Sequence, residues 1–210
     1  MTFPSHRPLI YLISDGSITN ENYEQRSVSL LELIDAAVRL RIPLVQIREK
    51  QLSGRNLFDL ASSAVAKTRG SPTNLLINDR LDVAWASGAD GVHLTSNSFT
   101  ADLVRNVAPD GFVIGVSTHT TDEIENAKKA GADFAVFGPT YETRGKGSAT
   151  GLDRLKDVVQ AVEPFPVLAL GGIDETNYRD VLSVGAAGFA AIRFLNNVAN
   201  LEMLSKEFEL

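Results

Sequence analysis

The sequence predicts an α/β protein in which eight parallel strands close into a single (β/α)8 TIM barrel. Three observations lead to this fold class. Short β-branched runs recur along the 210 residues, stretches with helical periodicity separate them, and a Gly-Ala step closes three of those stretches. Since a crossover between parallel strands needs a helix, regular alternation favours a parallel sheet. We expect one domain over residues 1–210.

Eight runs are the expected strands, because each is short, apolar and mostly rich in β-branched residues. In chain order they are Leu9–Ser14, Pro43–Glu49, Asn74–Asp79, Gly91–Leu94, Phe112–Thr118, Phe134–Pro139, Pro166–Gly172 and Gly188–Ile192. Eight strand-helix units favour the closed barrel. A doubly wound open sheet is the alternative, but it usually carries a Gly-x-Gly-x-x-Gly turn after its first strand, and this chain lacks one there.

The expected helices lie between these strands, where apolar residues recur every three or four positions. They cover Val28–Leu40, Arg55–Thr68, Leu81–Ser87, Thr100–Val107, Thr121–Gly131, Leu152–Val162 and Thr176–Ala186. Gly88, Gly131 and Gly185, each followed by alanine, come at the end of a helical stretch shortly before a strand. Glycine suits the left-handed conformation that ends a helix, so this weak repeat supports the alternation.

Composition narrows the functional classes. The net charge of −6 argues against general nucleic-acid binding, which usually needs a basic excess. The absence of cysteine excludes disulfides, thiolate metal sites and a cysteine nucleophile. We find no apolar run of the roughly 18 residues that span a bilayer and no signal-peptide pattern, so we expect a cytoplasmic protein without membrane partners.

Charged residues alternate with apolar ones along the second strand, in the run Pro43–Leu52. Side chains alternate between the two faces of a strand, so Val45 and Ile47 would face the helices. Gln46, Arg48 and Lys50 would then line the barrel interior and reach its C-terminal mouth, where barrel enzymes keep their sites. An amide and two cations at that place indicate an anionic ligand.

Further polar residues follow other strands of the predicted barrel. Asp79, next to Asn78, could hold Mg²⁺, which prefers carboxylate oxygens and shares them with substrate phosphates; it could equally cap the following helix. His119, after the fifth strand, is a candidate acid or base, whereas we expect His93 to be a packed or hydrogen-bonded core histidine. Three histidines on separate elements do not predict a zinc site.

The last third of the chain carries a candidate phosphate site and a long loop. Gly171 and Gly172 follow the seventh strand, where glycine N–H groups cradle phosphate in many barrels; a simple tight turn is the alternative. The eighth strand ends at Ile192 and Arg193. The loop Pro139–Gly151, with Arg144 and Lys146, has the length and composition of a lid, or else of a solvated insertion.

Seven ordered strings resemble those of thiamine-phosphate synthase and its close relative, thiazole tautomerase. They are VQIREK, LLINDRLDVA, GADGVHL, IGVSTH, GADFAVFGP, ALGGI and GAAGFAAI, and they span about Leu9 to Arg193. The resemblance implies a (β/α)8 barrel that joins hydroxymethylpyrimidine diphosphate to thiazole phosphate and releases pyrophosphate with the help of Mg²⁺. A homo-oligomer is one assembly that such a protein could form.

The resemblance also assigns roles to individual residues. Gln46, Arg48 and Lys50 would hold the diphosphate, Asn78 would orient it and Asp79 would bind Mg²⁺. Ser117 would contact the pyrimidine, and Lys146 would reach the leaving group. The residues expected around the thiazole phosphate are Thr143, Gly172, Ile192 and Arg193.

Three positions depart from the pattern of the synthase. Ser98 replaces a second metal carboxylate, Gly145 replaces a loop threonine, and Arg193 replaces a serine. The tautomerase, an isomerase of carboxythiazole phosphate, shares these departures, and His119 matches its working histidine. The presence of all the residues expected to bind the diphosphate and its metal favours the synthase; they are Gln46, Arg48, Lys50, Asn78 and Asp79. A non-catalytic thiazole- or thiamine-phosphate binding protein and a sugar-phosphate isomerase or epimerase are further alternatives.

Overall fold

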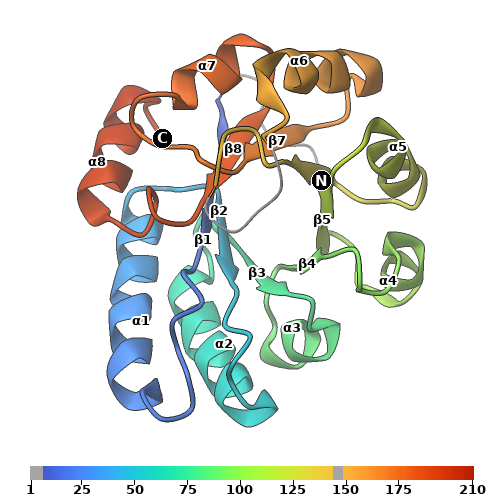
Figure 1. Ribbon diagram of the computed structural model, residues 1–210. Helices are drawn as coiled ribbons and strands as arrows, with labels where there is room; N and C mark the ends of the chain where they lie inside the picture. The colour runs from blue at the N-terminus through green and yellow to red at the C-terminus, as the bar shows by residue number, and fades with distance from the viewer. Residues whose placement is uncertain (1–6, 144–148) are drawn as a thin grey trace. The chain divides into compact units, whose positions relative to one another are not determined.

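The computed structural model describes residues 7–143 and 149–210, and its strands form a closed parallel barrel in the order β1 to β8 (Figure 1). The strands are β1 (Leu9–Ile13), β2 (Leu44–Ile47), β3 (Asn74–Asn78), β4 (Gly91–Leu94), β5 (Val113–Thr118), β6 (Phe134–Phe137), β7 (Val167–Leu170) and β8 (Gly188–Ala191). Each predicted strand is present, and the predicted (β/α)8 barrel is confirmed.

A helix follows each strand (Figure 1). The helices are α1 (Tyr23–Arg39), α2 (Gly54–Thr68), α3 (Leu81–Ser87), α4 (Ala101–Val107), α5 (Thr121–Lys129), α6 (Gly151–Val162), α7 (Tyr178–Ser183) and α8 (Val198–Glu207). α1 begins five residues before the predicted start at Val28. α8 was not predicted, because only Leu201 and Leu204 on it are buried and its periodicity is correspondingly weak.

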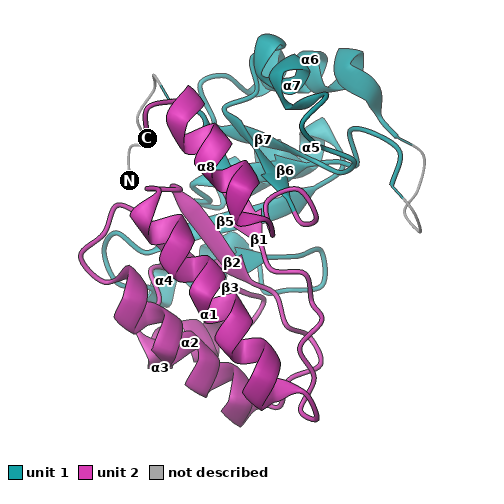
Figure 2. Ribbon diagram, turned by 90° about the vertical axis from the view of Figure 1, so that its left-hand side faces the viewer, with its two compact units in different colours: residues 1–10, 93–191 teal, residues 11–92, 192–210 magenta. Residues whose placement is uncertain are grey.

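Contacts along the chain divide it into two compact units (Figure 2). Unit 2 consists of residues 11–92 and 192–210, and in it α1 packs against both α2 and α8. β1 pairs with β2 through Ile13 and Gln46, and β2 pairs with β3 through Gln46 and Leu76, both in parallel register. The expectation of a single domain over residues 1–210 stays a prediction.

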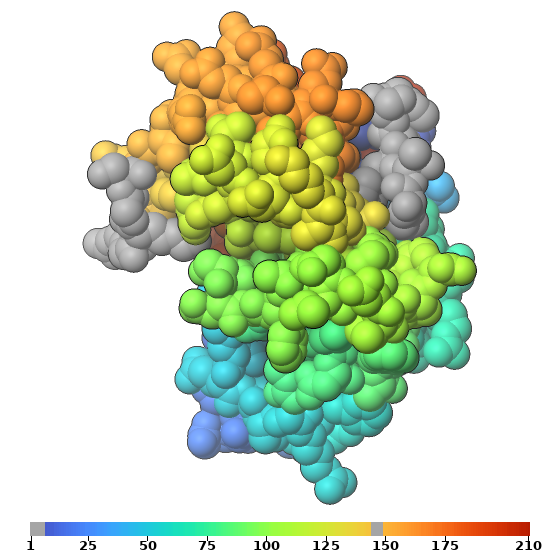
Figure 3. Space-filling model, turned by 90° about the vertical axis from the view of Figure 1, so that its right-hand side faces the viewer, coloured from blue at the N-terminus to red at the C-terminus, as the bar shows by residue number. Residues whose placement is uncertain are grey.

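Unit 1 consists of residues 1–10 and 93–191, and it contains the parallel ladder from β5 to β8. Its core includes Tyr178 and Phe189, whose ring centroids lie 5.6 Å apart. Figure 3 shows the face on which α4 and α5 lie, coloured green and yellow-green. Among the described residues, no helix combines the length and the apolar character that a membrane crossing requires.

Candidate active site

Gln46 belongs to the interior of the barrel, as the alternation predicted. Its side chain is 1% exposed, and its Nε2 donates a hydrogen bond of 2.6 Å to the Oη of Tyr11. Ile47, on the opposite face of the strand, lines a pocket together with Leu57 of α2, so that face is turned toward the helices. Burial raises the pKa of Tyr11 far above its usual range, so its phenol stays neutral and can accept from the amide.

Arg48 and Lys50 follow β2 rather than belonging to it, because the strand ends at Ile47. The alternation of a strand therefore does not extend to Lys50, which lies in an exposed turn, while Arg48 is half-buried. Among the described residues of unit 2, neither cation forms an ion pair with a carboxylate. Two cations without carboxylate partners are available to an anion.

Asn78 and Asp79 stand at the end of β3, beside Lys50. A pocket of about 250 Å³ at this end of the strand is lined by Lys50, Asn78, Asp79 and Arg80, and Glu49 also forms part of its wall. Asp79 adopts a left-handed backbone conformation with φ of 66°, which non-glycine residues rarely adopt and which recurs at functional sites. Arg80 is the N-cap residue of α3, and its own side chain makes no cap hydrogen bond. Whether Asp79 holds a metal ion or bonds the start of α3 stays a prediction.

These residues fit an Mg²⁺ ion that takes some of its ligands from the substrate. The described residues contain no cluster of three or more histidine or acidic side chains that could hold a metal ion by themselves. Mg²⁺ is commonly held by one or two carboxylates and by oxygens of the substrate phosphates. Asp79, in a pocket with Lys50, offers one such carboxylate where a diphosphate could approach.

Ser98, at the position of the absent carboxylate, closes a turn after β4. Its Oγ accepts a hydrogen bond of 2.7 Å from the N–H of Thr95, and its own N–H donates to the carbonyl of Thr95 at 3.0 Å. The serine hydroxyl is also neutral. It is therefore a poor substitute for a carboxylate ligand of a hard cation.

Ser117 on β5 contacts a buried histidine. The Nε2 of His93 lies 2.8 Å from the Oγ of Ser117, and His93 is 3% exposed, as expected for a hydrogen-bonded core histidine. The His93 ring lies against Phe134, with ring centroids 6.3 Å apart. A Cβ on Gly115 would come within 2.9 Å of the His93 ring, so a glycine is needed beneath this pair. The contact restricts the direction of the Ser117 hydroxyl.

His119, after β5, has a defined tautomer. Its Nδ1 lies 2.6 Å from the carbonyl oxygen of Gly138, and a carbonyl can only accept, so Nδ1 carries the proton. The backbone N–H of His119 donates to the side chain of Glu123, whose own N–H donates to the side chain of Thr120, the N-cap residue of α5. In the neutral ring, Nε2 is then the nitrogen that carries the lone pair.

The turn after β7 pairs with the start of the long β6–α6 loop. Tyr141 N–H donates to the carbonyl of Gly171 at 3.0 Å, and a Cβ on Gly172 would come within 2.7 Å of the Tyr141 Cβ. Close approach of two segments therefore explains the glycines. In the described part of unit 1, the N–H groups of Gly172 and Ile173 donate to no other group, which leaves them for a phosphate. Thr143 donates its hydroxyl to the Tyr141 carbonyl at 3.2 Å.

Ile192 and Arg193 follow β8 in a turn that Asn196 holds. The side-chain amide of Asn196 donates to the carbonyls of Ile13 and Ile192, both at 2.7 Å. Arg193 is exposed, and within the described part of unit 2 it forms no ion pair. Lys146, Arg144 and Gly145 lie outside the described residues.

The structure thus groups the predicted residues in two sets. Unit 2 holds Gln46, Arg48, Lys50, Asn78, Asp79, Ile192 and Arg193, and unit 1 holds Ser117, His119, Thr143 and Gly172. Sequence reasoning missed two contributors, Ser14 and Glu49, which contact Arg48 and the loop beside it. The sequence does contain a sign that Glu49 has a special role, because it is a carboxylate at a position where the alternation predicts an apolar side chain.

Comparison with known proteins identifies the family. The family model described as "Thiamine monophosphate synthase" matches residues 10–195. The chain belongs to the thiamine monophosphate synthase family. It is 40% identical over 186 residues to a thiamine-phosphate synthase of Methanoculleus marisnigri, covering 87% of this chain and 85% of that protein. It is 34% identical to a thiamine-phosphate synthase of Roseiflexus castenholzii, covering 90% and 82%.

A solved structure of the family has the same fold. Thiamine phosphate pyrophosphorylase from Pyrococcus furiosus superposes with a TM-score of 0.78 at 26% identity, covering 97% of this chain and 98% of that chain. The near-complete coverage on both sides means that the family resemblance extends over the whole barrel rather than over one motif.

Proposed function

We propose that this protein is a thiamine-phosphate synthase, a transferase that joins hydroxymethylpyrimidine diphosphate to thiazole phosphate and releases pyrophosphate. The observation that carries the proposal is the end of β2, where Arg48 and Lys50 have no carboxylate partner within unit 2 and Lys50 shares a pocket with Asn78 and Asp79. Relatives named thiamine-phosphate synthase, 34% and 40% identical over most of the chain, support it.

The reaction breaks the bond between the pyrimidine methylene carbon and the diphosphate oxygen, whose electron pair leaves with pyrophosphate. The thiazole nitrogen then donates its lone pair to that carbon. Such a step needs concentrated positive charge at the leaving group and little acid-base chemistry. Arg48 and Lys50 would supply that charge, with Gln46 and Asn78 orienting the diphosphate.

Asp79 would hold Mg²⁺, which when bound supplies further positive charge to the diphosphate. Ser117 would hydrogen-bond the pyrimidine in the direction that His93 imposes on its hydroxyl. In unit 1, the N–H groups of Gly172 and Ile173 and the side chain of Thr143 would bind the thiazole phosphate. The family resemblance assigns the same role to Ile192 and Arg193 and a contact with the leaving group to Lys146. Because both substrates are charged phosphates that do not cross a bilayer, we infer that the enzyme works in the cytoplasm.

The direct test is incubation of the protein with both substrates, with and without Mg²⁺, followed by chromatographic detection of thiamine phosphate. We expect product only with Mg²⁺. If neither condition yields product while the protein is folded, the assignment as a synthase fails.

One observation favours a second candidate, the tautomerase. The Gly138 carbonyl fixes the tautomer of His119, so its Nε2 could move a proton on a carboxylated thiazole phosphate. That enzyme would convert its substrate without Mg²⁺ and would lose the activity in His119→Ala. We expect the His119→Ala variant to retain thiamine phosphate synthesis within a few-fold, which kinetics with both substrate sets will decide.

A further inference from the structure

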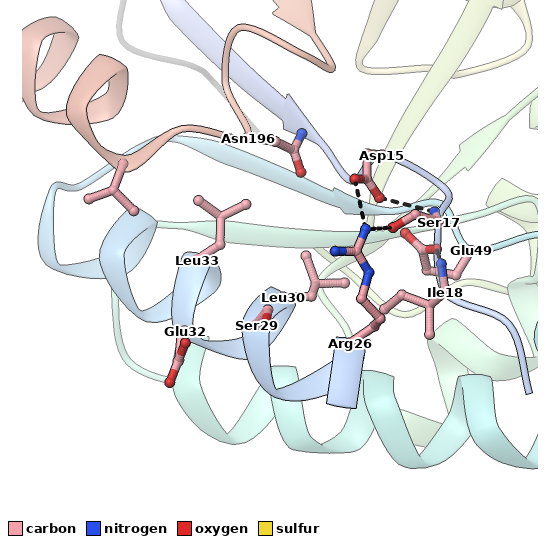
Figure 4. Close-up of a pocket in the computed structure, with 11 residues that line it drawn as sticks. Asp15, Ser17, Ile18, Arg26, Ser29, Leu30, Glu32, Leu33, Glu49 and Asn196 are labelled. Atoms are coloured by element: carbon pink, nitrogen blue, oxygen red, sulfur yellow. Dashed lines mark hydrogen bonds and ion pairs between the residues drawn. The ribbon is translucent and has the colours of Figure 1, made fainter. Parts of the chain in front are cut away.

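Glu49 has a buried carboxylate that the proposed reaction does not use directly. The residue is 3% exposed, although it lies between Arg48 and Lys50 at the end of β2. Its Oε2 accepts a hydrogen bond of 2.9 Å from the N–H of Ile18, and its Oε1 accepts one of 3.1 Å from the N–H of Gly16. The carboxylate therefore holds the β1–α1 loop, and Figure 4 shows it beside Ser17 and Ile18 of that loop.

Ser14 connects this carboxylate to the backbone of Arg48. Its hydroxyl donates to Oε1 of Glu49 at 2.6 Å and accepts from the N–H of Arg48 at 2.8 Å. The N–H of Ser14 also donates to the carbonyl of Gln46 at 2.9 Å, which extends the ladder between the first two strands. Ser14 is 1% exposed, so these bonds are protected from water.

The same loop borders the side chain of Arg48. A Cβ on Gly16 would lie 3.4 Å from the carbonyl oxygen of Arg48 and 3.6 Å from its Nη1. Gly16 has a φ of 76°, which glycine adopts without strain. The Nη1 of Arg48 therefore lies beside Gly16, in the loop that Glu49 holds. Ser14 bonds the backbone of Arg48, and the loop borders its guanidinium group.

The carboxylate is bound by N–H and O–H groups rather than by a cation. Glu49 also lines a second pocket, of about 300 Å³, beside the β1–α1 loop (Figure 4). Within the described part of unit 2, no ion pair includes Glu49; Arg26, which lines that pocket too, pairs with Asp15 and bonds Ser17. A carboxylate only accepts hydrogen bonds, and here three donors converge on it. Glu49 can therefore fix the loop without neutralising the neighbouring cation.

We propose that Glu49 is a positioning residue that, through Ser14 and the β1–α1 loop, holds Arg48 in the conformation that binds a diphosphate. The inference rests on the proposed function for the identity of the ligand. It assigns Glu49 no contact with substrate: its effect reaches the ligand only through Arg48.

The test uses binding of inorganic pyrophosphate, in the presence of Mg²⁺, to the full-length protein by calorimetry. Glu49→Gln keeps the shape of the side chain but places an amide NH₂ where an acceptor is needed. We expect pyrophosphate to bind the variant about tenfold or more weakly. The matched control is Glu32→Gln, an exposed glutamate that lines the same pocket, and we expect it to bind like the wild type.

A double-mutant cycle separates positioning from general loss of structure. If Glu49 acts through Arg48, the change Glu49→Gln made in an Arg48→Ala background will weaken pyrophosphate binding no further. Unchanged affinity in Glu49→Gln alone, or a loss that adds in full to that of Arg48→Ala, overturns the proposal. In the kinetic assay, we expect the KM for the pyrimidine diphosphate to rise and the KM for thiazole phosphate to stay unchanged.

A second variant covers the case in which Glu49→Gln does not fold. Ser14→Ala removes only the hydroxyl that joins Glu49 to the Arg48 N–H, and it should weaken pyrophosphate binding in the same direction; wild-type affinity in this variant would contradict the proposal. The pyrophosphate assay needs no turnover. Pyrophosphate binding without thiamine phosphate formation would refute the synthase alone, whereas a wild-type protein that binds no pyrophosphate would refute the positioning role.

Discussion

The ends of β2 and β5 orient their polar residues by different means. After β2, the hydroxyl of Ser14 bonds both the buried carboxylate of Glu49 and the backbone N–H of Arg48, and among the residues described in unit 2 the guanidinium of Arg48 has no carboxylate partner. At the end of β5, the imidazole of His93 holds the Ser117 hydroxyl, and the Gly138 carbonyl holds the ring of His119. The end of β2 leaves the charge of Arg48 available to a ligand, whereas the end of β5 fixes the direction of hydrogen-bonding groups.

This difference matches two kinds of ligand. A diphosphate is recognised by charge, and a cation without a carboxylate partner binds it most strongly. A heteroaromatic ring carries little charge and is recognised by donors and acceptors of fixed direction. We therefore expect substitutions at the two strand ends to differ both in size and in the substrate that they affect.

Arg48→Ala should have the largest effect. Removal of the cation takes away charge stabilisation of the leaving diphosphate, and we expect turnover to fall about a hundredfold or more. The measurement is the rate of thiamine phosphate formation at saturating substrates. Arg55→Ala is the matched control, because Arg55 lies on α2 with 90% of its side chain exposed. A wild-type rate in Arg48→Ala would remove the distinction between the two strand ends.

Asp79→Asn should follow, with a loss of turnover of about tenfold to a hundredfold. Asparagine tolerates the left-handed backbone of Asp79, so the fold should be retained while the Mg²⁺ ligand is weakened. The test is a titration of activity with Mg²⁺, in which half-maximal activity should require more metal. Asp59→Asn, on the exposed face of α2, serves as the control. An unchanged titration would exclude Asp79 as a ligand.

Ser117→Ala should have a smaller effect, because a neutral hydrogen bond contributes less than a charge-assisted one. We expect kcat/KM for the pyrimidine diphosphate to fall about tenfold. Pyrophosphate affinity should remain that of the wild type. Ser96→Ala, an exposed serine after β4, is the control. Loss of pyrophosphate affinity in Ser117→Ala would show that the two strand ends do not divide the substrate in this way.

The smallest expected effect is on the pH dependence of the free energy of unfolding. Burial raises the pKa of Glu49 above its ordinary value, which hydrogen bonds from Ser14, Ile18 and Gly16 oppose. The folded protein then holds this proton to higher pH than the unfolded chain does, so the free energy of unfolding falls as pH rises through the window between the two pKa values. The contribution is complete below the unfolded pKa of about 4.3 and is lost above the folded one.

The comparison of wild type with Glu49→Gln isolates this contribution. The two proteins differ only at this side chain, so the difference between their unfolding curves reports the Glu49 carboxyl together with its coupling to the nearby Asp15. Urea unfolding from about pH 4 to about pH 7 should show the wild type losing stability relative to the variant as pH rises. Parallel curves would mean that the pKa of Glu49 is not raised.

Much of the candidate site could be predicted, because it lies where strands end. Gln46 is buried on the interior face of β2, as period-two alternation predicts, and Asn78 ends β3 as expected. The same rule did not predict the position of Lys50, because β2 stops at Ile47 and side chains alternate only within a strand. Where the backbone leaves the ladder, the direction of a side chain depends on the loop that receives it.

The sequence by itself determined the order of the eight strands and the first seven helices, the barrel and the identity of the polar residues at the strand ends, because periodicity and turn chemistry are local. Only the tertiary structure decided that Glu49 turns toward the β1–α1 loop, that Ser14 links it to Arg48 and that His93 meets Ser117. These contacts join residues 24 to 35 positions apart along the chain. Buried polar groups must find partners, and only the folded chain brings those partners within reach.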